Sequence, residues 1–480
     1  MKENPEISKP HNRFGTGVWV GLAIFSIIFG FIYSNFTQDD AFITYRYARN
    51  IAEGIGFVYN PGEWVLGTTT PLYTLLLAAF AFITKIDVAV ISFLICILSL
   101  WLGSGFLYEL GKIRSREYGL TVALLYLTCP FLPQFMGMES FFLLFLLIFA
   151  AWIYERHKFL LTSIVCGLLI LVRYEMAIFV TILCIYDLIR KRNFPVWILS
   201  GLIPVLAWVI FAVITFGSPI PLSASAKLLA SNTPFTLGLA GYIFSFIGRS
   251  SLWLLVIVYF FIGLFSTLST RKFHGGYSII AIYAGVYFII ASLIAGSFPW
   301  YYAPLIPLLA IFAATGTVFL SRLPHVVNLK LDLPAKQKTS SFLEICFAAI
   351  VISIQLIFWY KDAISYRNQP FDHRFKAYTQ VSVWLNRHAL KEQSIAALEI
   401  GYIGYQTNMK IFDLYGLITP EILPWVAEGS EAGLQHSLIL FSPDYVLLPI
   451  DKGHHLQIMA EDSRYQQVQT FESRYILYKK

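Results

Sequence analysis

Charged residues are scarce in this chain of 480 residues: they make up 13% of it, whereas hydrophobic residues make up 57%. A typical soluble domain carries about 25% charged residues, so the composition excludes an ordinary soluble protein and favours one that crosses a membrane many times. Cysteine is also rare, and each of the five cysteines falls within an apolar run. We therefore expect neither a disulfide framework nor a thiolate metal site.

Several motifs of soluble enzymes are missing. The sequence contains no GxxxxGK[ST], HExxH, CxxC or GxSxG pattern, and Gly401-Tyr402-Ile403-Gly404 does not form a dinucleotide-binding fingerprint. These absences argue against a nucleotide-binding fold, a zinc protease, a thiol redox enzyme and an α/β-hydrolase. The net charge of +7 lies in the apolar part of the chain, because residues 361–480 are nearly neutral, so it indicates membrane topology and not nucleic-acid binding.

Eleven apolar runs predict membrane-spanning helices, with 13 as the alternative. A run that spans the hydrocarbon core needs about 20 residues, so the shorter ones must include flanking aromatic or polar residues. We treat Leu72–Ile83 as interfacial or re-entrant, since Lys85 and Asp87 separate it from the next run. The predicted spans are Val18–Phe36, Val88–Leu107, Tyr118–Phe135, Phe141–Tyr154, Phe159–Val172, Met176–Ile189, Val196–Phe216, Leu252–Leu268, Tyr277–Ala295, Tyr301–Leu320 and Phe342–Tyr360.

Positive charge recurs between pairs of these runs and orients them. If cationic loops face the cytoplasm, the N-terminus is cytoplasmic as well, and the first span is an uncleaved signal anchor because it lacks a clear cleavage site. The cationic positions are Lys112, Arg114, Arg116, Arg156, Lys158, Arg190, Lys191, Arg192, Arg271, Lys272 and the stretch from Arg322 to Lys338. This topology places the loop at residues 36–85 and the C-terminal region outside.

Composition changes at residue 361. Residues 1–360 predict a multispanning membrane domain, whereas residues 361–480 have the composition of a small soluble α/β domain. Arg374–His388 has helical periodicity, Gln466–Tyr478 alternates like a hairpin, and short strands are expected at Ser394–Leu398, Lys410–Leu414 and Tyr445–Leu448. We therefore expect a helical polytopic membrane protein that carries a small α/β domain on its outer face.

The first outer loop begins with two adjacent carboxylates, Asp39 and Asp40. Two neighbouring like charges hold a proton more tightly than one, which suits a general base near neutral pH. Asp is equally favoured at the start of a helix, so both residues could instead cap the helix that follows. The two roles can coexist, and spacing does not distinguish Asp39 from Asp40 as the base.

A second set of ionisable residues falls on the same predicted face. Glu139, Arg173 with Glu175, and Lys227 lie at the outer turns of three successive pairs of spans. Ionisable groups at membrane depth are costly and suggest function, although Arg173 and Glu175 could also form a purely structural ion pair. All of these residues are predicted to lie on the same side of the membrane as Asp39, which favours the functional interpretation.

These stretches resemble the bacterial GT-C glycosyltransferases, and most closely the group that includes the cell-wall terminal arabinofuranosyltransferases. The sequence departs from the commoner pattern at Met138, Tyr174 and Leu222-Ser223, which leaves the donor sugar open. The resemblance rests on Asp39-Asp40-Ala41-Phe42-Ile43-Thr44-Tyr45-Arg46-Tyr47-Ala48-Arg49-Asn50, Gly54-Ile55-Gly56, Asn60-Pro61-Gly62-Glu63, Gly67-Thr68-Thr69-Thr70-Pro71, Gly137-Met138-Glu139-Ser140, Leu171-Val172-Arg173-Tyr174-Glu175, Gly217-Ser218-Pro219-Ile220-Pro221 with Ala226-Lys227, and Ile403-Gly404-Tyr405 with Asp413-Leu414-Tyr415-Gly416-Leu417.

The resemblance implies a transferase that moves a sugar from a polyprenyl-phosphate donor to a glycan, lipid or protein acceptor of the cell envelope. The catalytic aspartate of such enzymes lies in the first outer loop, which matches Asp39 or Asp40 here. We expect Asp39 to accept the proton of the acceptor hydroxyl, with inversion at the sugar and Asp40 assisting.

Basic and acidic side chains complete the expected site. Arginine and lysine suit the donor phosphate, so we assign Arg173 and Lys227 to it, and Arg46 because it lies two helical turns after Asp39. We assign Glu63, Glu139 and Glu175 to sugar or acceptor binding. No cofactor is assigned with certainty, and a divalent cation held by Glu63 or Glu139 stays open.

Two other functions fit the same observations in part. A transporter or flippase for the lipid-linked sugar would also carry intramembrane charges, although no inverted repeat is visible. A glycan-binding sensor would use the outer α/β domain. Both place the chain in the cytoplasmic membrane, as the transferase does, and neither predicts that neutralising an aspartate abolishes turnover while leaving donor binding intact.

Overall fold

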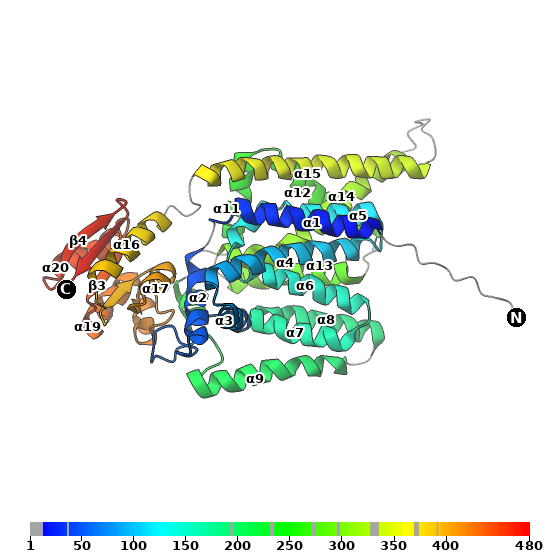
Figure 1. Cartoon of the computed structure of the whole chain (residues 1–480). Coiled ribbons are helices and arrows are strands. Elements are labelled where there is room, and N and C mark those ends of the chain that lie inside the picture. Colours follow the sequence, from blue (N-terminus) through cyan, green and yellow to red (C-terminus); the bar gives the residue numbers. More distant parts are fainter. Residues whose placement is uncertain are drawn as a thin grey trace.

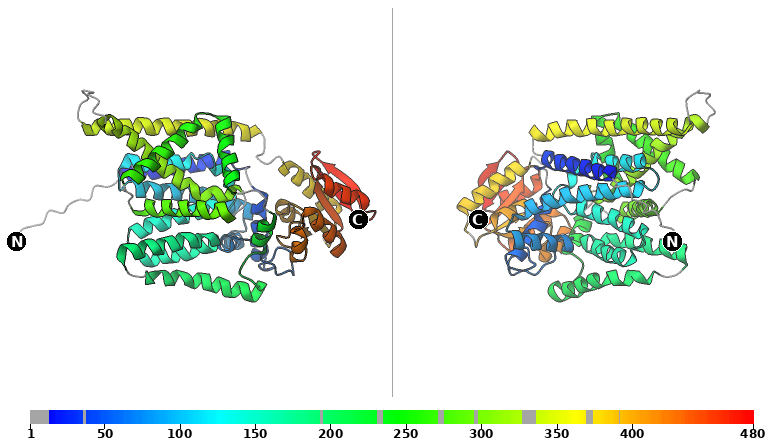
Figure 2. Two further views of the ribbon diagram at one scale, coloured as in Figure 1. Left: turned by 180° about the vertical axis from the view of Figure 1, so that it is seen from behind. Right: turned by 45° about the vertical axis from the view of Figure 1, so that its right-hand side comes forward.

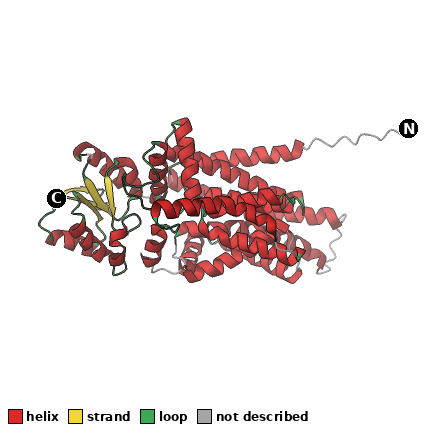
Figure 3. Cartoon of the chain, turned by 90° about the horizontal axis from the view of Figure 1, so that it is seen from below, coloured by secondary structure: helices red, strands yellow, loops and turns green. Residues whose placement is uncertain are grey.

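The chain folds into a bundle of helices with a small α/β domain at one end (Figure 1). The computed structural model describes residues 13–35, 38–192, 195–230, 235–270, 275–294, 298–326, 336–368, 374–390 and 392–480. The predicted cationic positions Arg271, Lys272 and Lys330 lie outside the described residues. Strands occur only in the C-terminal domain within the described part of the chain, and the two parts are clearly separate when viewed from below (Figure 3).

Each predicted span overlaps an α-helix, but the span predicted over Tyr118–Phe135 extends beyond the end of its helix. Within the described residues, seven stretches are long and apolar enough to cross a membrane by length and composition, and the shorter apolar helices include Ser140–Glu155 and Phe159–Val172. The bundle helices are α1 (Arg13–Ile32), α4 (Val88–Gly111), α5 (Arg116–Leu127), α6 (Ser140–Glu155), α7 (Phe159–Val172), α8 (Ala177–Lys191), α9 (Leu199–Phe216), α11 (Phe235–Arg249), α12 (Trp253–Thr270), α13 (Gly275–Ile294), α14 (Ile306–Val326) and α15 (Lys336–Asn368). The predicted class, a polytopic helical membrane protein with a C-terminal α/β domain, is confirmed.

The run predicted as one span over Tyr118–Phe135 is divided. Helix α5 ends at Leu127, and a turn leads into the 3-10 helix η1 (Leu132–Phe135). Pro130 and Pro133 explain the break, because proline lacks the backbone N–H that would continue the helix and its ring clashes with the preceding turn. The chain therefore bends back before α6, which sets Glu139 at the mouth of the bundle.

Helices α2 (Asp39–Ala52) and α3 (Pro71–Thr84) lie at the end of the bundle that faces the C-terminal domain. Helix α3 is seen nearly end-on in Figure 1, where the bundle helices lie lengthwise, so it runs across the bundle. This orientation agrees with an interfacial or re-entrant segment and not with a further span. The connections α4–α5, α6–α7 and α8–α9, which carry cationic loops, lie at the opposite end (Figure 2).

The C-terminal domain contains a five-stranded sheet in the order β2-β1-β3-β5-β4. Strands β1 (Ser394–Ala397), β2 (Lys410–Asp413) and β3 (Tyr445–Pro449) are parallel, and β4 (Gln466–Phe471) and β5 (Tyr475–Lys479) form an antiparallel hairpin. The helices are α16 (Arg374–His388), α17 (Gly401–Thr407), α18 (Leu423–Val426), α19 (Ser430–Leu440) and α20 (Gly453–Glu461). The predicted helix, the three short strands and the hairpin are thus confirmed.

The first outer loop joins the two parts. Tyr47 of α2 and Tyr59 of the following loop share one buried hydrophobic cluster with Ile403 of α17 and Leu447 of β3. Tyr59 also donates a hydrogen bond from its hydroxyl to the Ile400 carbonyl at 2.7 Å. The C-terminal domain is therefore packed against α2, so residues from both parts surround the end of the bundle.

Candidate active site

A cavity of about 460 Å³ opens between the end of the bundle and the C-terminal domain. It is lined by the first turn of α2, the segment before α3, and the loops that follow α7 and α9. Helix α10 (Leu222–Ala230) and the 3-10 helix η4 (Pro299–Leu305) close the other side, and Leu417 of the C-terminal domain reaches its edge. Segments far apart in sequence therefore meet here.

Asp40 and Lys227 form an ion pair inside this cavity. The Lys227 Nζ lies 2.6 Å from Asp40 Oδ2, and both side chains are largely buried. Although burial by itself lowers the pKa of Lys227, the negative charge of Asp40 outweighs it, and the lysine pKa is raised. Lys227 also lies 4.9 Å from the centre of the Trp300 ring. The pair thus places a permanent cation beside a carboxylate.

Arg173 is the second cation of the cavity and is almost fully buried. It forms ion pairs with Glu139, at 3.6 Å, and with Glu175. Its guanidinium donates to the Trp300 carbonyl at 3.3 Å and lies 4.9 Å from the centre of the Tyr301 ring. Although burial by itself lowers its pKa, the two carboxylates raise it, so Arg173 stays charged.

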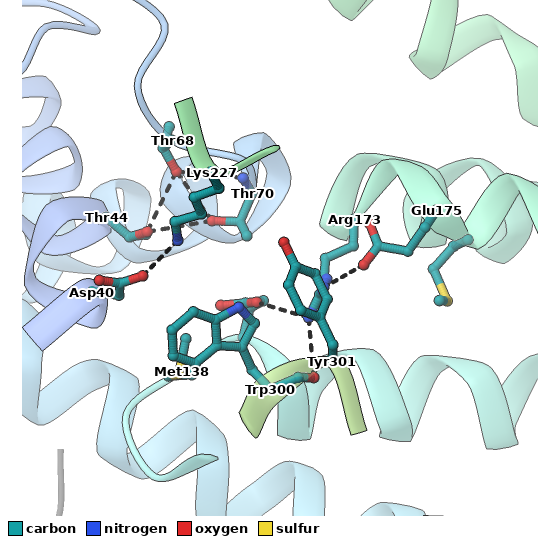
Figure 4. Close-up of polar contacts among 12 residues, drawn as sticks. Asp40, Thr44, Thr68, Thr70, Met138, Arg173, Glu175, Lys227, Trp300 and Tyr301 are labelled. Carbon is teal, nitrogen blue, oxygen red and sulfur yellow. Dashed lines mark hydrogen bonds and ion pairs between the residues drawn. The ribbon is translucent and has the colours of Figure 1, made fainter. Parts of the chain in front are cut away.

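Figure 4 shows how the two charged groups are arranged. Asp40 and Lys227 lie on one side and Arg173 with Glu175 on the other, and the rings of Trp300 and Tyr301 project between them. A phosphate near these rings would lie between two cations. Sequence reasoning had assigned no role to either aromatic residue, although the run Phe298-Pro299-Trp300-Tyr301-Tyr302 just before a span is a visible signal.

A cluster of threonine hydroxyls borders the Asp40 side. Thr44, Thr68 and Thr70 lie within 3.2 to 3.4 Å of one another, and all three line the cavity. Thr68 and Thr70 belong to the quoted Gly67–Pro71 motif but had received no role. On the opposite wall, the Trp208 indole donates to the Tyr174 hydroxyl at 2.8 Å. Hydroxyls and aromatic faces together suit a polar ligand with apolar ring faces, such as a sugar.

The Asp39 side chain does not line the cavity and instead contacts the C-terminal domain. Its two carboxylate oxygens accept hydrogen bonds from the backbone N–H groups of Gly401, at 2.9 Å, and Tyr402, at 2.8 Å, at the start of α17. A carboxylate at a helix N-terminus satisfies unpaired donors and is favoured by the helix dipole. Burial nevertheless raises the pKa of Asp39 to about 7. Asp39 therefore caps a helix, as the sequence suggested, but that helix is α17 and not the helix that follows Asp39 in the chain.

Arg46 and Glu63 also lie outside the cavity lining. Arg46 donates to the carbonyls of Tyr59, Gly404 and Met409 at 2.9, 2.7 and 2.7 Å. Glu63 forms an ion pair with Lys410 of β2 at 2.5 Å. The structure thus brings together Asp40, Arg173, Lys227, Glu139 and Glu175 of the sequence-based candidates, and places Asp39, Arg46 and Glu63 at the interface with the C-terminal domain.

The carboxylates of the cavity are engaged by basic groups. Within the described residues, no group of three or more His, Cys, Asp or Glu side chains is arranged to hold a metal ion. Glu139 and Glu175 both pair with Arg173, and Asp40 pairs with Lys227. The arrangement therefore suits an anionic ligand held by two cations, with a carboxylate beside it that can accept a proton.

Two solved structures share this fold. They are ArnT from Cupriavidus metallidurans bound to undecaprenyl phosphate and the same protein in the apo state, each with a TM-score of 0.62. The alignments cover 96% of this chain and 97% and 98% of those chains, at 11% and 12% sequence identity. The fold is therefore that of the GT-C class, as the resemblance implied.

A curated relative supports the narrower resemblance. Over 284 residues the chain is 26% identical to the terminal beta-(1->2)-arabinofuranosyltransferase of Mycobacterium tuberculosis (strain ATCC 25618 / H37Rv). The match covers 53% of this chain and 45% of the relative, so the chain spans less than half the length of that protein. Residues 364–478 match a family model described as a domain of unknown function (DUF8728). The similarity to arabinofuranosyltransferases inferred from the sequence is confirmed.

Proposed function

We propose that this chain is an integral-membrane glycosyltransferase that moves a sugar from a polyprenyl-phosphate donor to a hydroxyl of an envelope glycan, lipid or protein. The observation that carries the proposal is the cavity in which the Asp40–Lys227 pair faces Arg173 across Trp300 and Tyr301. The fold shared with a protein solved with undecaprenyl phosphate, and the similarity to an arabinofuranosyltransferase, support it.

Asp40 is the general base in this proposal. Lys227 bonds its Oδ2, and no donor among the described residues bonds Oδ1, which is left for the acceptor hydroxyl. As that oxygen attacks the anomeric carbon, its proton passes to Asp40, the new glycosidic bond forms, and the bond to the donor phosphate breaks with inversion. Asp39 has both oxygens engaged by α17, so it acts by holding the C-terminal domain against α2.

Lys227 and Arg173 stabilise the leaving group. The donor phosphodiester becomes a phosphomonoester, so negative charge grows on its oxygens during the reaction. Arg173 can bind phosphate bidentately, and Lys227 can move between Asp40 and the phosphate because it contacts the carboxylate by a single atom. Glu139 and Glu175 orient Arg173 and accept hydrogen bonds from sugar or acceptor hydroxyls.

Membrane placement follows from charge. The connections α4–α5, α6–α7 and α8–α9, which carry lysine and arginine, join helix ends at the end of the bundle away from this cavity, which the positive-inside rule assigns to the cytoplasm. The cavity and the C-terminal domain then lie on the outer face of the cytoplasmic membrane. A polyprenyl chain can remain in the bilayer there while its phosphosugar enters the cavity.

The test uses purified protein in detergent and a panel of radiolabelled polyprenyl-phosphate sugars. We expect one donor to be consumed by the wild type, and Asp40→Asn to lower transfer by about 100-fold or more while donor binding persists. Lys227→Gln should weaken donor binding as well as transfer. Glu63→Gln is the matched control, because Glu63 lies outside the cavity lining and pairs with Lys410.

Two results would overturn the proposal. If Asp40→Asn transfers sugar at the wild-type rate, the base is assigned wrongly. If no donor is consumed but labelled lipid exchanges between leaflets of liposomes that contain the protein, the chain is a flippase and not a transferase.

A further inference from the structure

A second cavity lies at the other end of the bundle and has no part in the proposed reaction. Its volume is about 490 Å³, and the ends of α4, α6 and α12 and the first turn of α13 surround it. These helix ends lie on the side opposite the C-terminal domain (Figure 1). The polar side chains that line it include Arg114, Tyr118, Glu155, Thr270 and Arg322.

Two arginines supply positive charge to this cavity and have no ion-pair partner among the described residues. The Arg114 guanidinium lies 4.6 Å from the centre of the Tyr118 ring, and the Tyr118 hydroxyl lies 3.0 Å from Thr315 Oγ1. Arg322 lines the same cavity from α14. Within the described residues neither arginine forms an ion pair, although Glu344 of α15 interacts with both at longer range. Guanidinium groups in this situation are suited to bind a phosphate.

A carboxylate on the same cavity also lacks a partner. Glu155 Oε1 is buried, and no hydrogen-bond donor reaches it among the described residues. It packs against the start of α13, where a Cβ added to Gly275 would lie 2.2 Å from this oxygen. A buried polar atom without a hydrogen bond is costly, so this oxygen is suited to accept a proton donor from a ligand.

We propose that this cavity binds the head group of a zwitterionic phospholipid of the phosphoethanolamine type from the cytoplasmic leaflet. Its phosphate contacts Arg114 and Arg322, and its ammonium donates to Glu155. An anionic head group such as that of phosphatidylglycerol would offer the Glu155 carboxylate only neutral hydroxyl donors and no positive charge, and a purely cationic one would face two arginines. The mixed charge of the cavity therefore favours a ligand with both signs.

The depth of the cavity favours a lipid over a free phosphoethanolamine. Arg322 lies about three helical turns from Ile311 on α14, and both line the cavity. Ile311 at the inner part, and Leu110 beside the start of α13, supply apolar surface suited to the glycerol and the first methylenes of the acyl chains. A small soluble molecule would leave that surface uncovered.

Native mass spectrometry of the delipidated full chain tests the proposal. Phosphatidylethanolamine, phosphatidylglycerol and phosphatidylcholine of equal chain length are added separately. We expect phosphatidylethanolamine to bind about tenfold more tightly than the other two. Arg114→Gln combined with Arg322→Gln should abolish this binding, and Glu155→Gln should remove the preference over phosphatidylglycerol. Lys158→Gln is the matched control, since Lys158 is an exposed cation at the same end that does not line the cavity.

Controls separate a lost site from a misfolded protein. Each variant must keep the thermal unfolding temperature of the wild type, and sugar transfer at the opposite end must be unchanged. Equal binding of all three lipids, or wild-type binding by the Arg114→Gln/Arg322→Gln variant, would overturn the proposal. Binding of soluble O-phosphoethanolamine as tight as that of the lipid would show that the site serves a soluble ligand, which also contradicts it.

Discussion

Arg46 is the residue for which sequence and structure suggest the most different roles. Sequence reasoning assigned it to the donor phosphate, whereas the structure shows it buried and bonded to backbone carbonyls of the first loop and the C-terminal domain. The change Arg46→Met decides between them, because methionine keeps an apolar stem of similar length but has no donor. Because Arg46 bonds backbone carbonyls and does not line the cavity, we expect this variant to lose stability and not donor affinity.

The size of the stability loss expected for Arg46→Met follows from the contacts of Arg46. A hydrogen bond to a charged group contributes about 1.5 to 3 kcal/mol, and Arg46 makes three well-formed ones to carbonyls at 2.7 to 2.9 Å. Burial of the guanidinium opposes this gain, and accordingly it lowers the pKa of Arg46. Because the substitution also leaves the Gly404 and Met409 carbonyls without this donor, we expect a net loss of about 3 to 5 kcal/mol in the attachment of the C-terminal domain.

Limited proteolysis and thermal unfolding in detergent measure this loss. Arg46→Met should be cleaved faster within residues 361–480 and should unfold at a lower temperature, while the folded fraction binds polyprenyl phosphate as the wild type does. Lys227→Met is the comparison, since Lys227 lies in the cavity and its loss should reduce binding. An Arg46→Met protein that resists protease like the wild type but fails to bind polyprenyl phosphate would refute the structural interpretation.

Three further predictions concern the same interface and the cavity. Burial raises the pKa values of Asp39 and Asp413 to about 7, so between about pH 4 and pH 7 the folded protein retains protons that the unfolded chain has lost. The free energy of unfolding should therefore fall over this pH range, by up to ~1.4 kcal/mol per pH unit for each group, and then level off. Asp39→Asn should roughly halve that slope in denaturation titrations. Gly404→Ala should destabilise the chain by about 1 to 3 kcal/mol in the same titrations at pH 8, because the new Cβ would lie 1.9 Å from the Tyr59 hydroxyl. Trp300→Ala should raise the KM for the donor about tenfold, because the ring lines the cavity, and should also lower the unfolding temperature, because the ring is buried in the core. An unchanged KM would exclude Trp300 from donor binding.

Local sequence determined most of the secondary structure. The helix predicted over Arg374–His388 has these bounds in the structure, and the three short strands and the hairpin occur where alternation placed them. Hydrophobic runs likewise located the bundle helices, because a helix in lipid must satisfy its backbone within its own segment. The exception at Tyr118–Phe135 is also local in origin: two prolines end the helix early.

The tertiary structure alone decided which polar residues belong to the site. Asp39 and Asp40 are neighbours in one helix, so their side chains point about 100° apart, and no spacing rule shows which direction faces the cavity. The packing of α17 against α2 determines which aspartate faces the cavity, because the N-terminal N–H groups of α17 bond Asp39 and leave Asp40 beside Lys227. Helical spacing alone places Arg46 with Asp39, but two of the three carbonyls that it bonds, those of Gly404 and Met409, lie more than 350 residues away in sequence. Helical periodicity shows which residues share one face of a single helix. A site made from seven or more segments depends instead on contacts between those segments, and these contacts form only in the folded chain.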